Sequence, residues 1–145
     1  MKYVFISVLF SIILCTNFAS ANDLHSAVLA NNLDKITLLI KKGKDVNEIN
    51  EEGQWPLLIC ATYGLDKAAV LLIDNGANIN MANIHGYTAF HEAASLGYRD
   101  IIKVFLKYKG DFSKRDINHY NVLNYAQMSG SESIVRLLKR HGATE

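Results

Sequence analysis

The chain has 145 residues, of which 50% are apolar and 20% charged, and this composition is typical of one globular domain and excludes a disordered chain. A formal net charge of +1 at pH 7 excludes a strong general attraction to nucleic acid or anionic lipid. One proline and nine glycines leave little room for long flexible linkers.

The first 21 residues have the three parts of a secretory signal peptide. Lys2 supplies a single positive charge, an apolar run extends from Tyr3 to Cys15, and the segment ends in Ala19-Ser20-Ala21. We therefore expect cleavage after Ala21. The mature protein would be periplasmic or secreted, with no stable membrane insertion.

An uncleaved membrane anchor, a lipoprotein signal and a core helix are the alternatives for this segment. The run from Tyr3 to Cys15 is shorter than the roughly 18 residues that a membrane-spanning helix needs. A lipoprotein signal would have a small residue before its cysteine, whereas Cys15 follows Leu14. Both observations favour cleavage.

Cleavage after Ala21 would change the charge and the cysteine content. Without Lys2, 14 basic residues balance 14 acidic residues, but residues 22–80 carry a net charge of −3 and residues 81–145 carry +3. Cys15 would leave with the signal, so Cys60 would have no partner for an intramolecular disulfide. We expect the Cys60 thiol to be buried and unreactive.

A period of 33 residues organises the chain from residue 22 onward. Three series of small or turn-forming residues recur at this spacing, which is difficult to obtain by chance. Bulky apolar pairs follow each member of the first series, so each unit is predicted to contain two short helices and a loop. The three series are Asn31, Gly64, Gly97 and Gly130; Gly53, Gly86 and His119; and Gly43, Gly76, Lys109 and Gly142.

Each part of the predicted unit has a physical cause. Pro56 suits the first position of a helix, because its φ is already helical and it has no amide hydrogen that needs a partner. Alanines such as Ala61 and Ala126 keep this first helix thin enough for close stacking. Gly64 and its equivalents end it in the left-handed conformation. Asp and Asn residues after the second helix favour turns.

The pattern resembles the ankyrin repeat, in its period and in parts of its sequence signature. The matching segments are Thr88 to Ala94 (TAFHEAA), Trp55 to Leu58 (WPLL) and Gly76 to Asn80 (GANIN). Unit two lacks the Thr and His of the signature, unit three lacks its Pro, and unit four departs further. The resemblance covers nearly all of residues 22–145. It implies an all-α solenoid of stacked helix-turn-helix units with short β-hairpin-like turns.

Four units are expected, covering residues 22–49, 50–82, 83–115 and 116–145. The first has no room for a preceding turn and would form an N-terminal cap. The last carries charged residues on its outer side, where no further unit would stack. Four units exceed the roughly three that a stable stack requires, so no further domain is needed.

The five histidines do not form a recognisable metal or acid–base site. His25 and His91 are two periods apart, and the resemblance implies that this histidine makes hydrogen bonds within the turn scaffold. None of the five is paired at positions i and i+4, as a helical zinc site would require. We therefore expect no metal and no cofactor.

Signatures of nucleophilic catalysis and phosphate binding are also missing from the sequence. No serine lies in a Gly-x-Ser-x-Gly elbow, and the glycines are not clustered into a phosphate-binding loop. Cys60 occupies a position where other units have alanine, which predicts a packing role. We expect no catalytic residue. An enzyme with an unrecognised site around His85, His119 and Glu52 is the alternative.

The resemblance implies that turn tips and the exposed side of each first helix form a concave face that binds a partner protein. Repeated Tyr and Ile residues on this face favour a binding role, because aromatic anchors combine large area with a polar tip. The alternative is that they cover neighbouring turns. The corresponding positions are Glu51, Glu52, Gln54, Thr62 and Tyr63; Ile84, His85, Tyr87, Ser95 and Leu96; and Ile117, Asn118, Tyr120, Met128 and Ser129.

The sequence therefore predicts an exported, monomeric solenoid that binds another protein and no nucleic acid. Tyr63, Tyr87 and Tyr120 are the expected anchors, with the charge gradient orienting the partner. A more specific role as an envelope inhibitor, immunity protein or stress-accessory protein stays open.

Overall fold

The computed structural model describes residues 23–144. This range is helical throughout its regular structure, which confirms the all-α prediction, whereas the predicted signal peptide lies outside the described residues. The helices are α2 (Leu24–Leu29), α3 (Leu33–Lys41), α4 (Pro56–Tyr63), α5 (Asp66–Asp74), α6 (Ala89–Ser95), α7 (Arg99–Lys107), α8 (Val122–Met128) and α9 (Glu132–Arg140).

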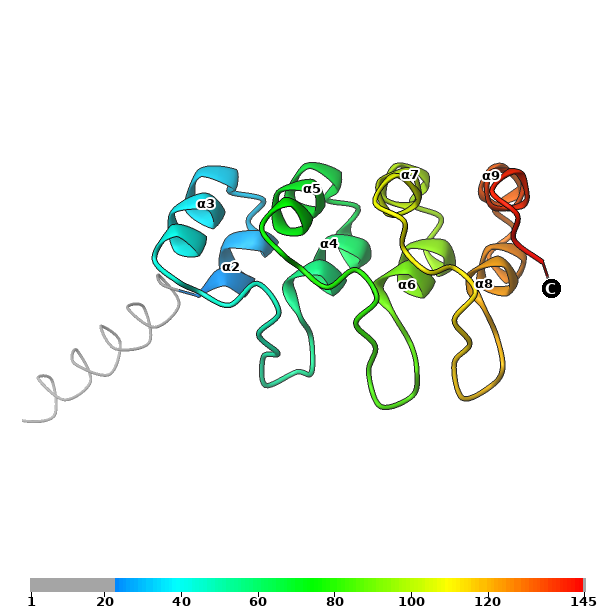
Figure 1. Cartoon of the computed structure of the whole chain (residues 1–145), viewed down its shortest axis with the longest axis horizontal. Helices are drawn as coiled ribbons and strands as arrows, with labels where there is room; N and C mark the ends of the chain where they lie inside the picture. The colour runs from blue at the N-terminus through cyan, green and yellow to red at the C-terminus, as the bar shows by residue number, and fades with distance from the viewer. Residues whose placement is uncertain (1–22, 145) are drawn as a thin grey trace, which may run out of the picture.

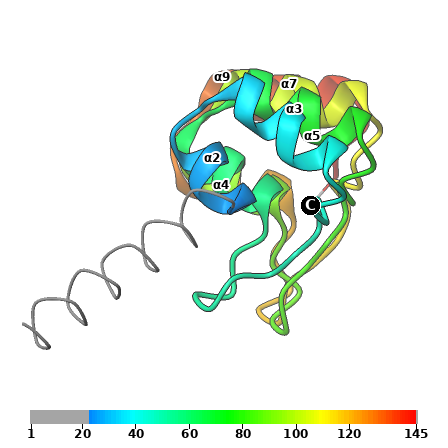
Figure 2. The ribbon, with the colours of Figure 1, turned by 90° about the vertical axis from the view of Figure 1, so that its left-hand side faces the viewer.

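The helices stack in two layers along the long axis of the molecule (Figure 1). The first helices of the units, α2, α4, α6 and α8, pack on one another, and the second helices, α3, α5, α7 and α9, form the other layer. The turns that lead into α4, α6 and α8 extend away from the second-helix layer (Figure 2). The first helices and these turns therefore bound a common face.

Three turns lead into first helices and recur below. We call them the first turn (residues 48–55), the second turn (residues 81–88) and the third turn (residues 114–121). The second turn closes as a short hairpin, with an antiparallel bridge between Ala82 and Thr88. This bridge agrees with the hairpin-like turns implied by the family resemblance.

Small residues in the first helices allow the close stacking of the units. Ala61, Ala93 and Ala126 are completely buried, and so is Cys60. Burial raises the pKa of the Cys60 thiol to about 12, so the thiol is neutral at physiological pH and is not an activated nucleophile. The larger core residues lie between the two layers, where Phe90 and Phe105 meet edge to face at 5.3 Å.

The three 33-residue series coincide with the left-handed backbone positions of the fold. All members of the series have positive φ, and no other residue in 23–144 does. Glycine adopts this conformation without a Cβ penalty. Asn31, Lys109 and His119 adopt it with side chains, at φ values of 49°, 58° and 64°. The 33-residue period in the sequence therefore arises from the left-handed turn positions that recur in each unit of the fold.

No helix within residues 23–144 is both long enough and apolar enough to cross a membrane.

Candidate partner-binding face

Most of the residues predicted to bind a partner are exposed on the face bounded by the first helices and the turns. Four of the fifteen predicted positions are half-buried, namely Gln54, Thr62, Tyr87 and Ser95. The exposed ones are Glu51, Glu52, Tyr63, Ile84, His85, Leu96, Ile117, Asn118, Tyr120, Met128 and Ser129.

Exposed apolar residues follow this face in two rows. One row lies on the turns and contains Ile49, Ile84 and Ile117. The other lies at the ends of the first helices and contains Leu29, Tyr63, Leu96 and Met128. Sequence reasoning missed Ile49, which does not fit the 33-residue spacing from Ile84, and Leu29, which belongs to the unit interpreted as a cap.

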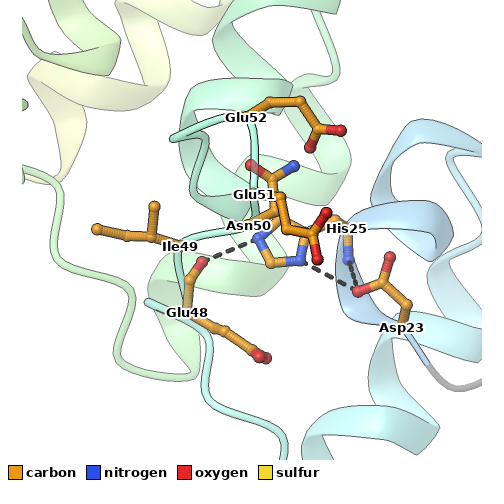
Figure 3. A pocket seen from close by; sticks show the side chains of 7 residues that line it. All are labelled: Asp23, His25, Glu48, Ile49, Asn50, Glu51 and Glu52. Carbon is orange, nitrogen blue, oxygen red and sulfur yellow. Dashed lines mark hydrogen bonds and ion pairs between the residues drawn. The ribbon is translucent and has the colours of Figure 1, made fainter. Parts of the chain in front are cut away.

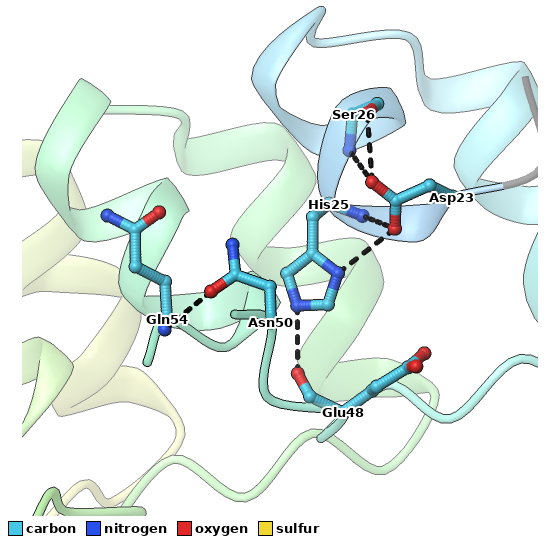
Figure 4. A network of polar contacts seen from close by, with 6 residues as sticks. All are labelled: Asp23, His25, Ser26, Glu48, Asn50 and Gln54. Carbon is cyan, nitrogen blue, oxygen red and sulfur yellow. Dashed lines mark hydrogen bonds and ion pairs between the residues drawn. The ribbon is translucent and has the colours of Figure 1, made fainter. Parts of the chain in front are cut away.

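Side chains at the start of the first helices tie most turns to the stack. His25 Nε2 lies 2.9 Å from the Glu48 carbonyl oxygen in the first turn, while its Nδ1 contacts Asp23 (Figure 4). His91 Nε2 lies 3.1 Å from the Lys114 carbonyl oxygen in the third turn. These contacts give His25 and His91 the structural role that the resemblance implies.

Unit four replaces the histidine bond with an amide. The Asn121 side chain donates to the Thr144 carbonyl oxygen at 2.9 Å and also caps α8. Unit two has Leu58 at the histidine position and Trp55 at the capping position, and no side chain caps the start of α4. The second turn therefore lacks the tie that holds the first and third turns.

Tyr87 belongs to a hydrogen-bonded network within the scaffold. Its hydroxyl donates to Glu92 at 2.9 Å, and Glu92 also accepts from Thr62 of the preceding unit at 3.2 Å. The Tyr87 ring stacks on His91 at 5.4 Å and meets Tyr125 edge to face at 5.3 Å. Burial and the Glu92 contact raise the pKa of the Tyr87 hydroxyl. These contacts hold the Tyr87 side chain against α6 and α8.

A small pocket of about 270 Å³ lies between the second and third turns. Asp116 lies in it and accepts from the Tyr125 hydroxyl at 2.7 Å and from the backbone amides of Asn118 and Tyr120 at 2.9 Å each. Burial alone would raise the pKa of Asp116, but these hydrogen bonds lower it overall. Burial and the same contact raise the pKa of Tyr125 to about 12. The carboxylate is thus engaged by its own chain.

An acidic pocket of about 370 Å³ lies at the other end of the face, beside the first turn (Figure 3). Asp23 accepts hydrogen bonds from Ser26 and His25. Burial alone would raise the pKa of Asp23, but these hydrogen bonds lower it overall. Within residues 23–144 no lysine or arginine forms an ion pair with the three glutamates of this pocket. The lining residues are Asp23, His25, Glu48, Ile49, Asn50, Glu51 and Glu52.

A third depression, of about 460 Å³, lies between the first and second turns. We call it the inter-turn groove. The indole of Trp55 lines it, is 2% exposed, and has no hydrogen-bond partner for its Nε1. The lining residues are Ile49, Glu52, Gly53, Trp55, Ala82, Asn83, Ile84 and His85.

The catalytic alternative proposed from the sequence combined His85, His119 and Glu52. Glu52 and His85 line the inter-turn groove, but His119 does not. In the part of the chain that the structure describes, no group of three or more His, Cys, Asp or Glu side chains is arranged to hold a metal ion.

The sequence matches the family model described as "Ankyrin repeats (3 copies)" over residues 24–116 and 60–145. "Inactive serine/threonine-protein kinase TEX14" of Bos taurus is 35% identical over 110 residues, which cover 76% of this chain and 7% of that protein. "Rabankyrin-5" of Mus musculus is 30% identical over 139 residues, which cover 84% of this chain and 12% of that protein.

"Ankyrin repeat domain-containing protein SAT10" of Stachybotrys chartarum is 29% identical over 136 residues, which cover 83% of this chain and 7% of that protein. The chain therefore spans only a small part of the length of these relatives. Their likeness to it concerns the repeats.

Proposed function

The chain belongs to the ankyrin repeat family, and we propose that it is an exported module that binds another protein through its concave face, without catalysis of its own. Ankyrin repeats are generally protein-interaction modules, and a repeat scaffold carries its specific function in surface residues. The observation that carries the proposal is the pair of exposed apolar rows on one face. Aligned apolar side chains at consecutive turns do not help to fold the units, whereas they suit a binding surface.

The anchors that we propose are Tyr63, Ile84 and Tyr120, which are all exposed. We leave Tyr87 out of these anchors, because Glu92, His91 and Tyr125 contact its hydroxyl and ring. Replacing Tyr87 would disturb the scaffold and binding together.

Charge supplies the orientation of the partner in this proposal. The first turn carries Glu48, Glu51 and Glu52, whereas the third turn carries Lys114 and Arg115. Opposite charges at the two ends of one face favour a single direction of binding and speed association. Export is proposed from the signal-like segment that ends at Ala21.

Site-specific photo-crosslinking tests the proposed face. A benzoylphenylalanine at position 84 or 120 of the full chain, expressed in its own cell, should crosslink one partner protein that mass spectrometry can identify. The same group at position 103 or 136, on the exposed side of α7 or α9, is the matched control. Crosslinks to one protein from the second-helix positions alone would contradict binding through the concave face.

A further inference from the structure

The first and second turns stand apart, whereas the second and third turns are joined. The Ile117 amide of the third turn donates to the His85 carbonyl oxygen of the second turn at 2.9 Å. One period earlier, the corresponding pair is the Ile84 amide and the Glu52 carbonyl, and no hydrogen bond joins them in the described structure.

The space beside the glycines shows the same difference between the turns. A Cβ added to Gly86 in the second turn would lie 3.0 Å from the Arg115 carbonyl oxygen of the third turn. A Cβ added to Gly53 in the first turn would have no atom within 4 Å. Because Leu58 also provides no bond to the second turn, the inter-turn groove opens at this junction.

Exposed apolar side chains lie on both turns that border the inter-turn groove. Ile84 is 93% exposed and Ile49 is 55% exposed, on opposite sides of the groove. Trp55 also lines the groove, at the position where units three and four have the helix-capping residues Thr88 and Asn121. The tryptophan side chain does not cap the helix, and its buried indole N–H has no hydrogen-bond acceptor among the described residues. Buried polar groups without a partner are rare in folded proteins.

The inter-turn groove continues into the acidic pocket. Ile49 and Glu52 line both depressions. Figure 3 shows the Ile49 side chain pointing away from Asp23 and Glu51, so that apolar and acidic groups lie on opposite sides of the first turn. The carboxylates of Glu48, Glu51 and Glu52 have no lysine or arginine partner among the described residues. An unneutralised acidic surface of this kind attracts a cationic group.

We propose that the inter-turn groove and the acidic pocket together bind an extended segment of the partner protein that carries an apolar side chain close to a lysine or arginine. The apolar side chain lies over Trp55 between Ile49 and Ile84. The cationic group lies across the first turn, at the carboxylates of Glu51 and Glu52. This inference rests on the proposed function and specifies the chemistry of the partner.

A random ten-residue peptide library without tryptophan, displayed on phage and selected on the immobilised full chain, tests this assignment. Selected peptides should carry Lys or Arg within two positions of Leu, Ile or Phe. Because Trp55 is the one tryptophan of the chain, a synthetic copy of the best peptide should change the tryptophan emission when it binds. The fluorescence anisotropy of a fluorescein-labelled copy of the peptide then gives its affinity for the chain.

Variants locate the bound peptide. Ile84→Ser, and separately Glu51→Gln with Glu52→Gln, should each weaken binding at least tenfold, while the matched variant Ile117→Ser should weaken it less than twofold. All of these residues are exposed, so circular dichroism should show unchanged folding. Failure to select any peptide, a consensus without basic residues, or equal effects of Ile84→Ser and Ile117→Ser would overturn the assignment.

The photo-crosslinking experiment separates this inference from the proposed function. A partner that crosslinks at position 120, but whose binding does not change in the groove variants, would leave the concave face as the binding surface and overturn the groove assignment. Crosslinking confined to the second-helix layer would reject the concave face itself.

Discussion

His91 Nε2 lies 3.1 Å from the carbonyl oxygen of Lys114, so a side chain at the start of α6 holds the turn that leads into α8. The same ring accepts the Thr88 amide at its Nδ1 at 3.1 Å. One buried imidazole thus caps its own helix and ties the next turn. In unit two Leu58 replaces the histidine, so no side chain at this position bonds to the second turn. The inter-turn groove lies beside that turn.

We expect His91→Leu to destabilise the protein by about 2 kcal/mol, because it leaves the Thr88 amide and the Lys114 carbonyl without their partners. The substitution copies the residue at position 58 and replaces the imidazole with an apolar side chain of similar size. Urea unfolding measures the loss. His85→Leu, at an exposed position, is the control and should change stability by less than about 0.5 kcal/mol. Equal losses in the two variants would argue against the tie.

Stability should fall as the pH decreases from 7.5 to 5.5. Burial lowers the pKa of His91 below its ordinary value, although hydrogen bonds and Asp116 oppose the shift. The unfolded chain therefore binds a proton first, near pH 6.5, and stability is lost from there down to the folded pKa, at up to about 1.4 kcal/mol per pH unit.

Thermal unfolding across this pH range measures the effect of His91. The slope should be smaller in His91→Leu than in the unmodified chain, because the variant has no group to titrate at this position. An unchanged slope in the variant would assign the pH dependence to other residues.

We expect Gly86→Ala to destabilise the protein more than Gly76→Ala. Both glycines have positive φ, at 75° and 92°, so an alanine is strained at either position by about 1–2 kcal/mol. Only at Gly86 would the new Cβ also approach a backbone oxygen, that of Arg115, at 3.0 Å. Denaturant unfolding of the two variants measures the difference, and equal losses would show that the second and third turns move apart at little cost.

From the proposed export and cleavage, we expect the mature protein to begin at Asn22. The intact mass of the protein recovered from the periplasm or medium measures this directly, and Ala21→Arg should cause the uncleaved chain to accumulate, because a signal peptidase requires a small residue before the cleaved bond. A recovered chain that still starts at Met1, with export unaffected by Ala21→Arg, would contradict cleavage.

The stacked fold could be predicted from the sequence because each unit repeats the same local requirements. The left-handed conformation at Gly64, Gly97 and Gly130 favours glycine, so glycine recurs in the sequence at a fixed spacing. Alanine recurs in the same way where the first helices pack closely. These features depend on neighbours within one unit or on an identical neighbouring unit.

The details of the candidate site could be predicted only in part. Exposure of Ile84 and Tyr120 followed from their register, whereas the engagement of Tyr87 depends on side chains from three segments, Thr62, Glu92 and Tyr125. The inter-turn groove had a signal in the sequence, because unit two lacks the Thr and His of the repeat signature. The sequence alone did not show that this histidine bonds to a carbonyl oxygen of the next turn, and so it did not show that a groove would open where the histidine is missing.

The affinity for the partner identified by crosslinking is the measurement that tests the binding face most directly. The double variant Ile84→Ser with Tyr120→Ser should weaken binding at least tenfold without unfolding the stack. The double variant Lys103→Ser with Lys107→Ser, on the exposed side of α7, should leave it within twofold. Unchanged affinity in the first variant with a large loss in the second would contradict binding through the concave face.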